Sequence, residues 1–378
     1  MSDRPTSSSV AGTFPKVLVL HDGNRGHIKQ SQAVLEIIRK VLTANRDTPE
    51  NLEVLFLEVI FRHPLLKAFV KVVSQWWANH CFFQRMILPS CVAPPSLNEL
   101  MNLNPDLILS CGASTSAMNL MLKKHSHARS IALLNPGALI RKAFDLVIVP
   151  RHDLDPYANI QPNLLITDLT PNLITPESVA RWRNAPGIEP KSLTLGLLMG
   201  GHNRTHRLTA QNATAITEGV LSLCSRLPAK LLVTTSRRTP PRVEMILEQA
   251  FRSQTFCKIF VSGKIGSGSD AVERILGISD LVLVSGDSIS MVSEAVSSGR
   301  PVVVFMPRKI VPFRTKYERF IGQLVADGLV TKVVPEEISR IDLPSLIRQQ
   351  PISPSARQNP VEDRLRDFLG AVRNRGEK

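Results

Sequence analysis

The chain has 378 residues. A single hydrophobic core usually organises fewer residues than this, so two domains are expected. Hydrophobic residues make up 43% of the chain and charged residues 21%, as in globular proteins, whereas only 5% aromatic residues disfavours a surface built for stacking bases. The net charge of +14 indicates either a role in solubility or an anionic partner: a phosphorylated small molecule, an anionic membrane surface or nucleic acid.

Further patterns narrow the location and the partners. Residues 1–15 are rich in Ser and Pro and predict a disordered lead-in. The sequence holds no run of 18 apolar residues, and its five scattered cysteines favour a reducing compartment, so we expect a cytoplasmic protein, either free or peripheral at a membrane. Zinc-finger spacing, an RNP-like aromatic strand and a basic zipper are all missing, so no specific nucleic-acid partner is expected, and the oligomeric state stays open.

From Lys16 onward, short β-type runs alternate with longer periodic segments, which predicts an α/β protein with parallel sheets covered by helices. Four prolines in residues 170–190 predict a linker between a first Rossmann-like domain, 16–169, and a second, 191–355, followed by a terminal helix in 356–378. The expected strands are 16–20, 52–60, 106–110, 129–134 and 145–149 in the first domain, and 193–199, 230–235, 257–261, 280–284 and 301–305 in the second.

The turn after the first strand reads HDGNRGH, with Gly23 and Gly26 placed where the backbone can approach a ligand. His27 falls at a helix start, where a neutral imidazole can act as a base toward an acceptor hydroxyl, and Asp22 could do the same. His21 is a third candidate. The alternative is structural: His27 caps the helix and Asp22 closes the turn.

The loop after the third strand offers a second pocket wall. Gly112 and Ser114 precede a helix there, and hydroxyls with free amides could hold a sugar or phosphate, although Ser is also a good helix cap. Cys111 beside them is expected to be a small buried residue, not a nucleophile. Farther on, Arg151, His152, Asp153 and Asp155 share one loop, which is predicted to line a cleft and not to bind a metal.

In the second domain, two strand ends carry glycine and cations. Gly200 and Gly201 are followed by Arg204, while the next strand ends in Ser236, Arg237 and Arg238. Such a loop suits a pyrophosphate in the absence of a metal, because arginine forks match phosphate oxygens. Exposed arginines can also simply be solvated.

The segment 282–304 has the strongest pattern: strand, Gly286-Asp287-Ser288 turn, amphipathic helix and second strand. A helix that starts at Asp287 or Ser288 directs unpaired N–H groups at an anion. Glu294 lies one turn beyond Ser290 on the same face, where a carboxylate could accept both hydroxyls of a ribose. The alternative is an ordinary βαβ crossover with an exposed Glu.

Residues 61–89 mix Trp76, Trp77 and other large apolar residues with Lys and Arg. A basic, aromatic-bearing amphipathic helix can lie on an anionic bilayer, or it can pack on the sheet with its cations in water.

Taken together, the segments HDGNRGHIKQSQA, PDLILSCG, FDLVIVPRHD, LLMGGHNRTHRL, VTTSRRTP and VSGDSISMVSEAVSSGRPV resemble the mitochondrial fission family, named for the plant elongated-mitochondria protein and widespread in bacteria. The resemblance runs from about Lys16 to Leu329. It implies a fold of the glycosyltransferase B type: two facing Rossmann-like domains, the donor nucleotide mainly on the second, and a terminal helix that crosses back to the first. It also implies glycosyl transfer for bacterial members and a membrane-peripheral adaptor role for the plant member. The acid-x7-acid pair of many retaining enzymes would need a carboxylate at Gly286, so that chemistry is disfavoured.

The first hypothesis is therefore a metal-independent glycosyltransferase without a cofactor, which moves a sugar from a nucleoside diphosphate sugar to a hydroxyl acceptor such as an envelope lipid or glycan. His27 or Asp22 would activate the acceptor, with Gly23, Gly26, Gly112 and Ser114 on the acceptor side. The alternatives are a nucleotide-sugar epimerase that uses the same donor cleft, and a non-catalytic adaptor at a membrane. The donor residues would be Gly200, Gly201, Arg204, Ser236, Arg237, Arg238, Gly286, Asp287, Ser288 and Glu294.

Overall fold

The computed structural model describes residues 16–43, 52–78, 80–155, 159–183, 193–264, 270–348 and 360–376. The chain forms two compact units: the first takes residues 1–149, 157–165 and 364–378, and the second takes 150–156 and 166–363. The predicted lead-in, residues 1–15, lies outside the described residues.

The first unit is built on a six-stranded sheet of order β2-β1-β3-β4-β5-β6, parallel from β2 through β5. All five predicted strands are confirmed within two residues at each end. Their middles are apolar and mostly fully buried, as expected where helices cover both faces. The strands are β1 (Val17–His21), β2 (Val54–Glu58), β3 (Leu107–Cys111), β4 (Arg129–Leu133), β5 (Leu146–Pro150) and β6 (Leu164–Thr167).

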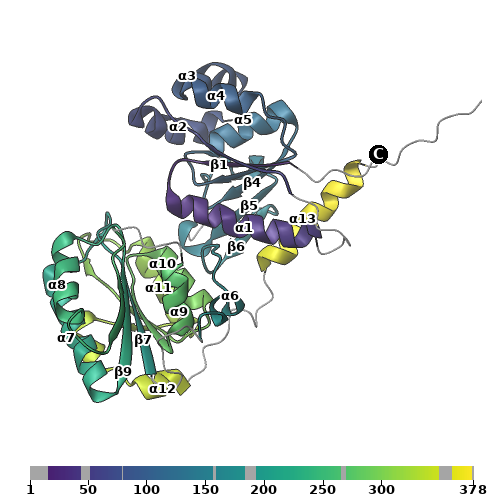
Figure 1. Cartoon of the computed structure of the whole chain (residues 1–378). Coiled ribbons are helices and arrows are strands. Elements are labelled where there is room, and N and C mark those ends of the chain that lie inside the picture. Colours follow the sequence, from purple (N-terminus) through teal and green to yellow (C-terminus); the bar gives the residue numbers. More distant parts are fainter. Residues whose placement is uncertain are drawn as a thin grey trace, which may run out of the picture. The chain divides into compact units, whose positions relative to one another are not determined.

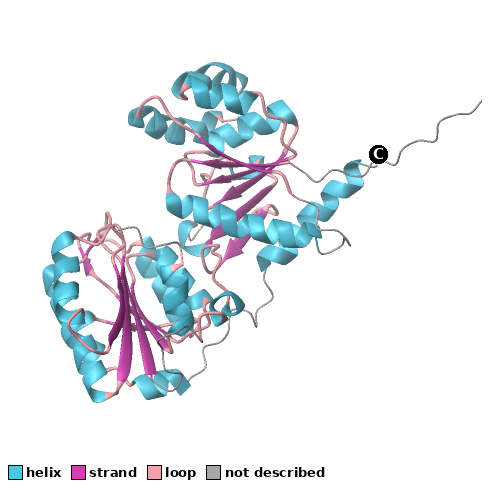
Figure 2. Ribbon diagram, in the orientation of Figure 1, coloured by secondary structure: helices cyan, strands magenta, loops and turns pink. Residues whose placement is uncertain are grey.

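Helices cover the two faces of this sheet (Figures 1 and 2). On one face, α2, α4 and α5 pack with a short π-helical turn and α3 around a core that includes Val70, Phe83 and Met118. Helix α1 lies on the other face (Figure 1). The bounds are α1 (Arg25–Thr43), α2 (Pro64–Trp77), the π-helical turn (Phe83–Ile87), α3 (Leu88–Cys91), α4 (Pro94–Met101), α5 (Ser116–Ser126), and short 3₁₀ turns at Arg141–Ala143 and Arg151–Asp153.

The terminal helix α13 (Pro360–Gly376) returns to the first unit, as the predicted fold class requires. The Arg129 guanidinium donates to the Phe368 carbonyl at 3.1 Å and lies 4.2 Å from the centre of the Phe368 ring. The Arg364 guanidinium donates to the Pro162 carbonyl at 2.6 Å. These contacts join the end of the chain to β4 and to the segment before β6.

The second unit repeats this plan, with a fully parallel six-stranded sheet of order β10-β9-β7-β11-β12-β14. All five predicted strands are again confirmed, and β14 completes the edge. The strands are β7 (Leu193–Met199), β9 (Ala229–Thr235), β10 (Cys257–Val261), β11 (Leu281–Ser285), β12 (Val302–Phe305) and β14 (Thr331–Val333), with a two-stranded ribbon of β8 (His206–Arg207) and β13 (Arg308–Lys309).

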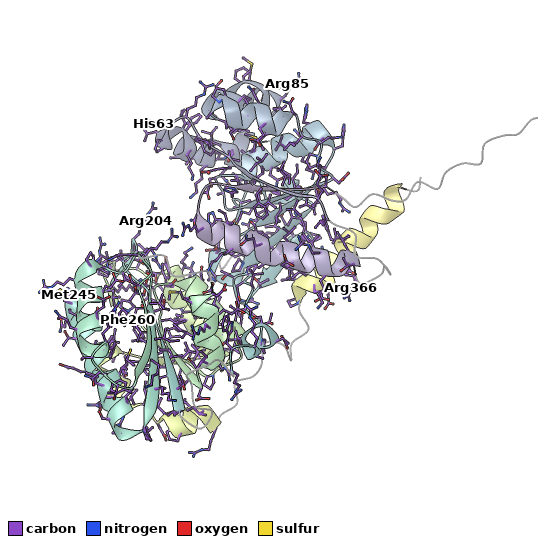
Figure 3. The ribbon with its side chains drawn as sticks, in the orientation of Figure 1. His63, Arg85, Arg204, Met245, Phe260 and Arg366 are labelled. Atoms are coloured by element: carbon purple, nitrogen blue, oxygen red, sulfur yellow. The ribbon has the colours of Figure 1, made fainter. Side chains whose placement is uncertain are left out.

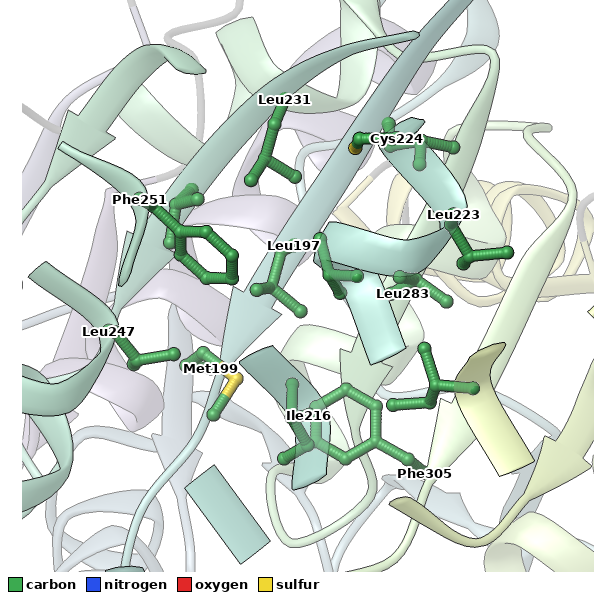
Figure 4. Close-up of a cluster of buried hydrophobic side chains, with 14 of the residues drawn as sticks. Leu197, Met199, Ile216, Leu223, Cys224, Leu231, Leu247, Phe251, Leu283 and Phe305 are labelled. Carbon is green, nitrogen blue, oxygen red and sulfur yellow. The ribbon is translucent and has the colours of Figure 1, made fainter. Parts of the chain in front are cut away.

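Two apolar cores, one on each face, hold this second sheet. Helices α7 and α8 cover one face, where Phe251 and Phe305 are fully buried (Figure 4). Helices α9, α10 and α11 cover the other (Figure 1). Each fully buried leucine or phenylalanine contributes about 1.5–3 kcal/mol to folding. The bounds are α6 (Pro176–Ala180), α7 (Ala210–Arg226), α8 (Pro241–Phe251), α9 (Ala271–Ile278), α10 (Ile289–Ser297), α11 (Lys316–Ala326), a 3₁₀ turn (Pro335–Arg340) and α12 (Leu343–Arg348).

The predicted linker, 170–190, differs from the observed boundary. As far as it is described, it belongs to the second unit, and its last residues, 184–190, lie outside the described part. The Thr170 N–H donates to Ser293 Oγ of α10 at 3.2 Å, and Val179 of α6 is buried in the core with α9. A side chain on Gly277 would clash with the Val179 carbonyl at 2.3 Å, so α6 and α9 pack backbone to backbone. The prolines predict a segment with little regular structure, but tertiary packing decides where a domain begins.

The search for membrane spans covered the described residues and found no helix with the length and apolar character needed to cross a bilayer.

Candidate functional site

Each sheet reverses its strand order at one point, and most of the predicted site residues follow the strands on either side of it. In the first sheet the reversal falls between β1 and β3, and in the second between β7 and β11. Open α/β sheets bind ligands beyond the carboxyl ends of the strands at such a point. The loops after β1 and β3 hold the predicted acceptor-side residues. The predicted donor residues follow β7, β9 and β11, except Glu294, which lies within α10.

In the first unit, the Asp22 carboxylate is the centre of a four-residue cluster. Its Oδ1 lies 3.0 Å from His27 Nδ1, and its Oδ2 accepts from Ser114 Oγ at 2.7 Å. The Lys67 ammonium, from α2, is 3.0 Å from the same Oδ2. Loops after β1 and β3 and one covering helix thus converge on a carboxylate whose side chain is only 8% exposed.

Burial alone would raise the pKa of Asp22, but the hydrogen bonds from His27, Ser114 and Lys67 outweigh it and hold this pKa well below its ordinary value. Asp22 is therefore an anion that does not take up a proton near neutral pH. Because Asp22 engages Nδ1 of His27, Nε2 is the ring nitrogen outside this bond, and an adjacent carboxylate would stabilise the imidazolium that proton abstraction creates. The cluster suits His27 to the role of base and Asp22 to that of its orienting partner.

Two glycines make this arrangement possible. Gly112 has φ +83°, and a side chain there would approach His27 Cε1 to 2.9 Å, so the glycine leaves the space in which the imidazole lies. Gly23 has φ +76°, and a side chain there would meet the Glu58 carboxylate at 2.7 Å. Both glycines are required by turn geometry and close packing, whether or not a ligand also approaches. Gly26 begins α1, where its N–H donates to Asn24 Oδ1 at 2.9 Å.

His21, the third candidate base, points back into its own turn. Its Nδ1 accepts from the Gly23 N–H at 3.3 Å. The His21 ring makes no hydrogen bond to Asp22 or Ser114, so His27 is the better placed imidazole.

In the second unit, the Asp287 carboxylate fastens the loop after β11 to the loop after β7. Its Oδ2 accepts from the Gly201 N–H at 2.8 Å and lies 3.4 Å from the Arg238 guanidinium, while Ser285 Oγ donates to Oδ1. Burial raises the pKa of Asp287, and the hydrogen bonds from Gly201 and Ser285 act against that rise. A side chain on Gly200 would fall 2.1 Å from Asp287 Oδ1.

The donor roles of Gly200, Gly201 and Asp287 stay predictions, and the structure gives each of these residues a packing role. The Gly201 N–H and the Asp287 carboxylate are engaged with each other, and both glycines are needed where loops pack closely; a side chain on Gly201 would clash with the Arg238 carbonyl at 2.1 Å. Gly286 likewise lies against Met306, whose Sδ would be 2.2 Å from an added Cβ. At these positions a glycine is required by close loop packing, whether or not a ligand also approaches.

In the turn after β9, some polar residues make hydrogen bonds within the protein and others are exposed to solvent. Ser236 Oγ accepts from the Arg238 N–H at 3.2 Å, so the serine closes the turn. Arg238 Nη1 donates to the His202 carbonyl at 3.3 Å in addition to its pairing with Asp287. Among the described residues, Arg237 and Arg204 are exposed and make no side-chain hydrogen bond or ion pair, and Arg204 projects from the loop end of the unit (Figure 3). These two arginines are available to an anionic ligand.

Helix α10 has the predicted orientation. Ser288 is its N-cap, and the Ser288 side chain makes no capping hydrogen bond to the first turn. Ile289, Met291 and Val292 are buried, whereas Ser290 and Glu294 share the partly exposed face, as their spacing predicts. Ser293 and Ser297 of the same helix instead contact the segment 170–172. Ser293 Oγ accepts from the Thr170 N–H, and Ser297 Oγ accepts from the Asn172 side-chain amide.

Sequence reasoning missed two features of these sites. Lys67 is 45 residues from Asp22 along the chain and falls in a helix read only as basic and amphipathic, so nothing local linked the two. At the carboxyl ends of β9 and β10, the Glu244 carboxylate accepts from Thr235 Oγ1 at 2.8 Å and from Ser262 Oγ and pairs with Lys264 at 2.9 Å. The Glu244 carboxylate and its partners Thr235 and Ser262 are largely buried and close the edge of the sheet.

The loop after β5 belongs to the second unit and packs on α11. Lys316 is 2.9 Å from the Asp153 carboxylate, and the His152 ring lies edge-on to Phe320 with centroids 4.8 Å apart. His152 is thus core, which differs from the predicted cleft lining. No group of three or more His, Cys, Asp or Glu among the described residues is placed to hold a metal ion. Cys111 is buried, as expected.

The whole chain resembles a known sugar-nucleotide enzyme in fold. A UDP-GlcNAc 2-epimerase from Neisseria meningitidis, solved with UDP-GlcNAc bound, superposes with a TM-score of 0.54 over 95% of this chain and 100% of that one, at 14% sequence identity. This shows the two-domain, glycosyltransferase B type of fold, with two Rossmann-like domains. At 14% identity, the likeness shows the fold alone and does not indicate which substrate this chain binds.

Sequence comparison finds relatives in bacteria and plants. An uncharacterized protein, RP120, of Rickettsia prowazekii is 23% identical over 274 residues, which is 64% of this chain and 75% of the relative. The mitochondrial fission protein ELM1 of Arabidopsis thaliana is 23% identical over 225 residues, 53% of this chain and 51% of the plant protein, so the match spans about half of that relative. The model of the family described as mitochondrial fission ELM1 matches residues 25–355, a range that holds the His27 imidazole and every loop of the second site, and the chain belongs to this family.

Proposed function

We propose that this protein is a glycosyltransferase that moves a sugar from a nucleoside diphosphate sugar to a hydroxyl acceptor. The observation that carries the proposal is the Asp22–His27 pair, 3.0 Å apart at the strand-order reversal of the first sheet. A carboxylate that orients a histidine at a ligand-binding edge is a means of removing a proton from a hydroxyl.

The chemistry is a single displacement. His27 Nε2 takes the proton of the acceptor hydroxyl while the acceptor oxygen forms a bond to the anomeric carbon. The bond from that carbon to the phosphate oxygen breaks, and the nucleoside diphosphate leaves with the electron pair. Attack opposite the leaving group inverts the configuration, which accords with the absence of a carboxylate at Gly286.

The second unit would hold the donor without a metal. Arg204 and Arg237 are exposed cations at the loop end of its sheet, and the start of α10 at Ser288 directs N–H groups and a positive dipole end outward. Both would stabilise the negative charge that builds on the departing diphosphate. Glu294, one helical turn beyond Ser290, would accept the ribose hydroxyls. A membrane-peripheral adaptor that keeps this fold without catalysis is the rival proposal.

A calorimetric titration with UDP, GDP, ADP, CDP and dTDP tests the donor half. One diphosphate is expected to bind well above the rest, and a protein that binds none of them is not a glycosyltransferase but fits the adaptor. Release of that diphosphate from its sugar-linked form, with added glycans or lipids as acceptors, tests the transfer. Return of an epimerised sugar nucleotide without any acceptor would instead identify an epimerase.

A further inference from the structure

One stretch of the first unit exposes most of its large apolar side chains. Eight of the sixteen exposed large hydrophobic residues in the described chain lie between Ile60 and Met86. Trp76 is 68% exposed and Trp77 is 47% exposed. Scattered surface hydrophobes are ordinary, but this density within one helical layer is typical of an interaction surface.

Helix α2 carries two rows of apolar side chains, offset from each other by one residue. Leu66, Val70 and Val73 pack into the core of the first unit. The outward side repeats at helical spacing with four exposed residues: Leu65, Phe69, Val72 and Trp76. A helix that covers a sheet needs only one apolar side, so the second side, here called the outer α2 face, is not explained by folding.

The stretch of chain that carries the outer α2 face has charges of one sign. The sequence has no Asp or Glu between Glu58 and Glu99, and this stretch carries Arg62, Lys71 and Arg85, all exposed. His63 and Arg85 lie at the outer rim of this helical layer (Figure 3). A second copy of the chain in a two-fold dimer would bring cation against cation, because such an interface pairs a patch with itself. An anionic partner has no such penalty.

We propose that the outer α2 face docks on an anionic lipid bilayer. Leu65, Phe69 and Val72 enter the boundary between headgroups and acyl chains, tryptophans settle at that boundary, and the cations face the anionic headgroups. The same helix supplies Lys67 to Asp22. Docking would therefore place a base-bearing cluster next to lipid-borne hydroxyls; that last step rests on the proposed function, and the docking itself does not.

Flotation with vesicles tests the docking. The full chain is expected to float with vesicles of phosphatidylcholine plus phosphatidylglycerol and to float less with phosphatidylcholine alone or at high salt, since salt screens the cation contribution. A variant of the outer α2 face should lose roughly tenfold or more of this binding, because four apolar side chains no longer leave water. Its substitutions are Leu65→Ser, Phe69→Ser, Val72→Ser and Trp76→Ser.

A matched control removes exposed apolar residues elsewhere. Met245 and Phe313, 50% and 62% exposed, lie in the second unit, and Met245→Ser with Phe313→Ser should float like the wild type. The four replaced side chains are exposed, so the variant should keep its melting temperature. It should also keep its diphosphate titration, which separates failure of docking from failure of the proposed function.

Tryptophan fluorescence gives a second readout. The chain has three tryptophans, and Trp182 packs against the core of the second unit, so Trp182→Phe leaves Trp76 and Trp77 as reporters. Their emission should shift to the blue on vesicles, and brominated lipid should quench it. If Trp182→Phe does not fold, Trp76→Phe with Trp77→Phe in the otherwise wild-type chain should abolish the quenching instead.

Three results would overturn the proposal. The wild type could fail to float with anionic vesicles, or the outer α2 face variant could float as well as the wild type. Alternatively, sedimentation could show a dimer that the variant dissociates while neither protein floats, and the face would then be a contact between copies.

Discussion

The N–H of Gly201 donates to the Asp287 carboxylate at 2.8 Å, and this bond joins two loops that are 86 residues apart in the chain. The two strands that lead into these loops, β7 and β11, are neighbours at the strand-order reversal. Asp287 therefore shapes the loop end of this sheet from within. In the proposed function, a donor at this end of the sheet would contact Arg204, Arg237 and the start of α10.

Gly200→Ala should destabilise the second unit by about 1–3 kcal/mol, because the added methyl group falls 2.1 Å from Asp287 Oδ1 and must displace the carboxylate. Urea unfolding measures the free energy. Gly370→Ala is the matched control: no atom lies within 4 Å of its added methyl group in α13, so it should be neutral or stabilising. Equal effects of the two substitutions would contradict the close packing of the loop.

Asp22→Asn should reduce transfer on the order of 100-fold or more while donor affinity stays unchanged, because the amide cannot stabilise the His27 imidazolium. His27→Ala should reduce transfer as strongly, and the double variant should lose little more, since the two residues act as a unit. Initial rates and diphosphate titrations measure the two quantities. His21→Ala is the control; a larger loss there than in His27→Ala would reassign the base.

Glu294→Gln should weaken donor binding by on the order of 1–3 kcal/mol, because an amide accepts fewer charge-assisted hydrogen bonds from a ribose. Calorimetry with the preferred nucleoside diphosphate measures the loss, and inorganic pyrophosphate should bind as before. Glu248→Gln, on the surface of α8, is the comparison variant. Unchanged nucleotide affinity in Glu294→Gln would remove the ribose role from α10.

Acid should unfold the protein partly through His152. Burial lowers the pKa of His152 to about 4, with Lys316 and Arg319 adding to the effect and Asp153 opposing it. Between pH 6.5 and 4 the unfolded chain binds a proton that the folded chain does not, so stability falls as the pH falls, by about 3 kcal/mol.

His152→Gln should therefore flatten the pH dependence of the free energy of unfolding between pH 6.5 and 4. His125→Gln, at an exposed position on α5, should leave it unchanged. Urea melts at a series of pH values give the comparison. Parallel pH profiles for wild type and His152→Gln would show that other groups account for the acid sensitivity.

The sequence by itself determined the fold class, all ten predicted strands and the side of α10 that carries Ser290 and Glu294. These features are local: apolar runs with period 2 or 3.6 indicate burial directly, because most buried positions in a parallel sheet are apolar. The glycine turns after β1, β3, β7 and β11 were found for the same reason, since each follows its strand at once.

Only the tertiary structure decided what those turns do. Asp22 and Ser114 are 92 residues apart, and Lys67 comes from a third element, so no local pattern announces their cluster. A Gly-Gly pair looks the same whether it admits a phosphate or the carboxylate of Asp287. The placement of residues 170–183 and of His152 in the second unit likewise follows from packing on α9, α10 and α11, because burial between distant segments is a property of the folded chain and not of either segment alone.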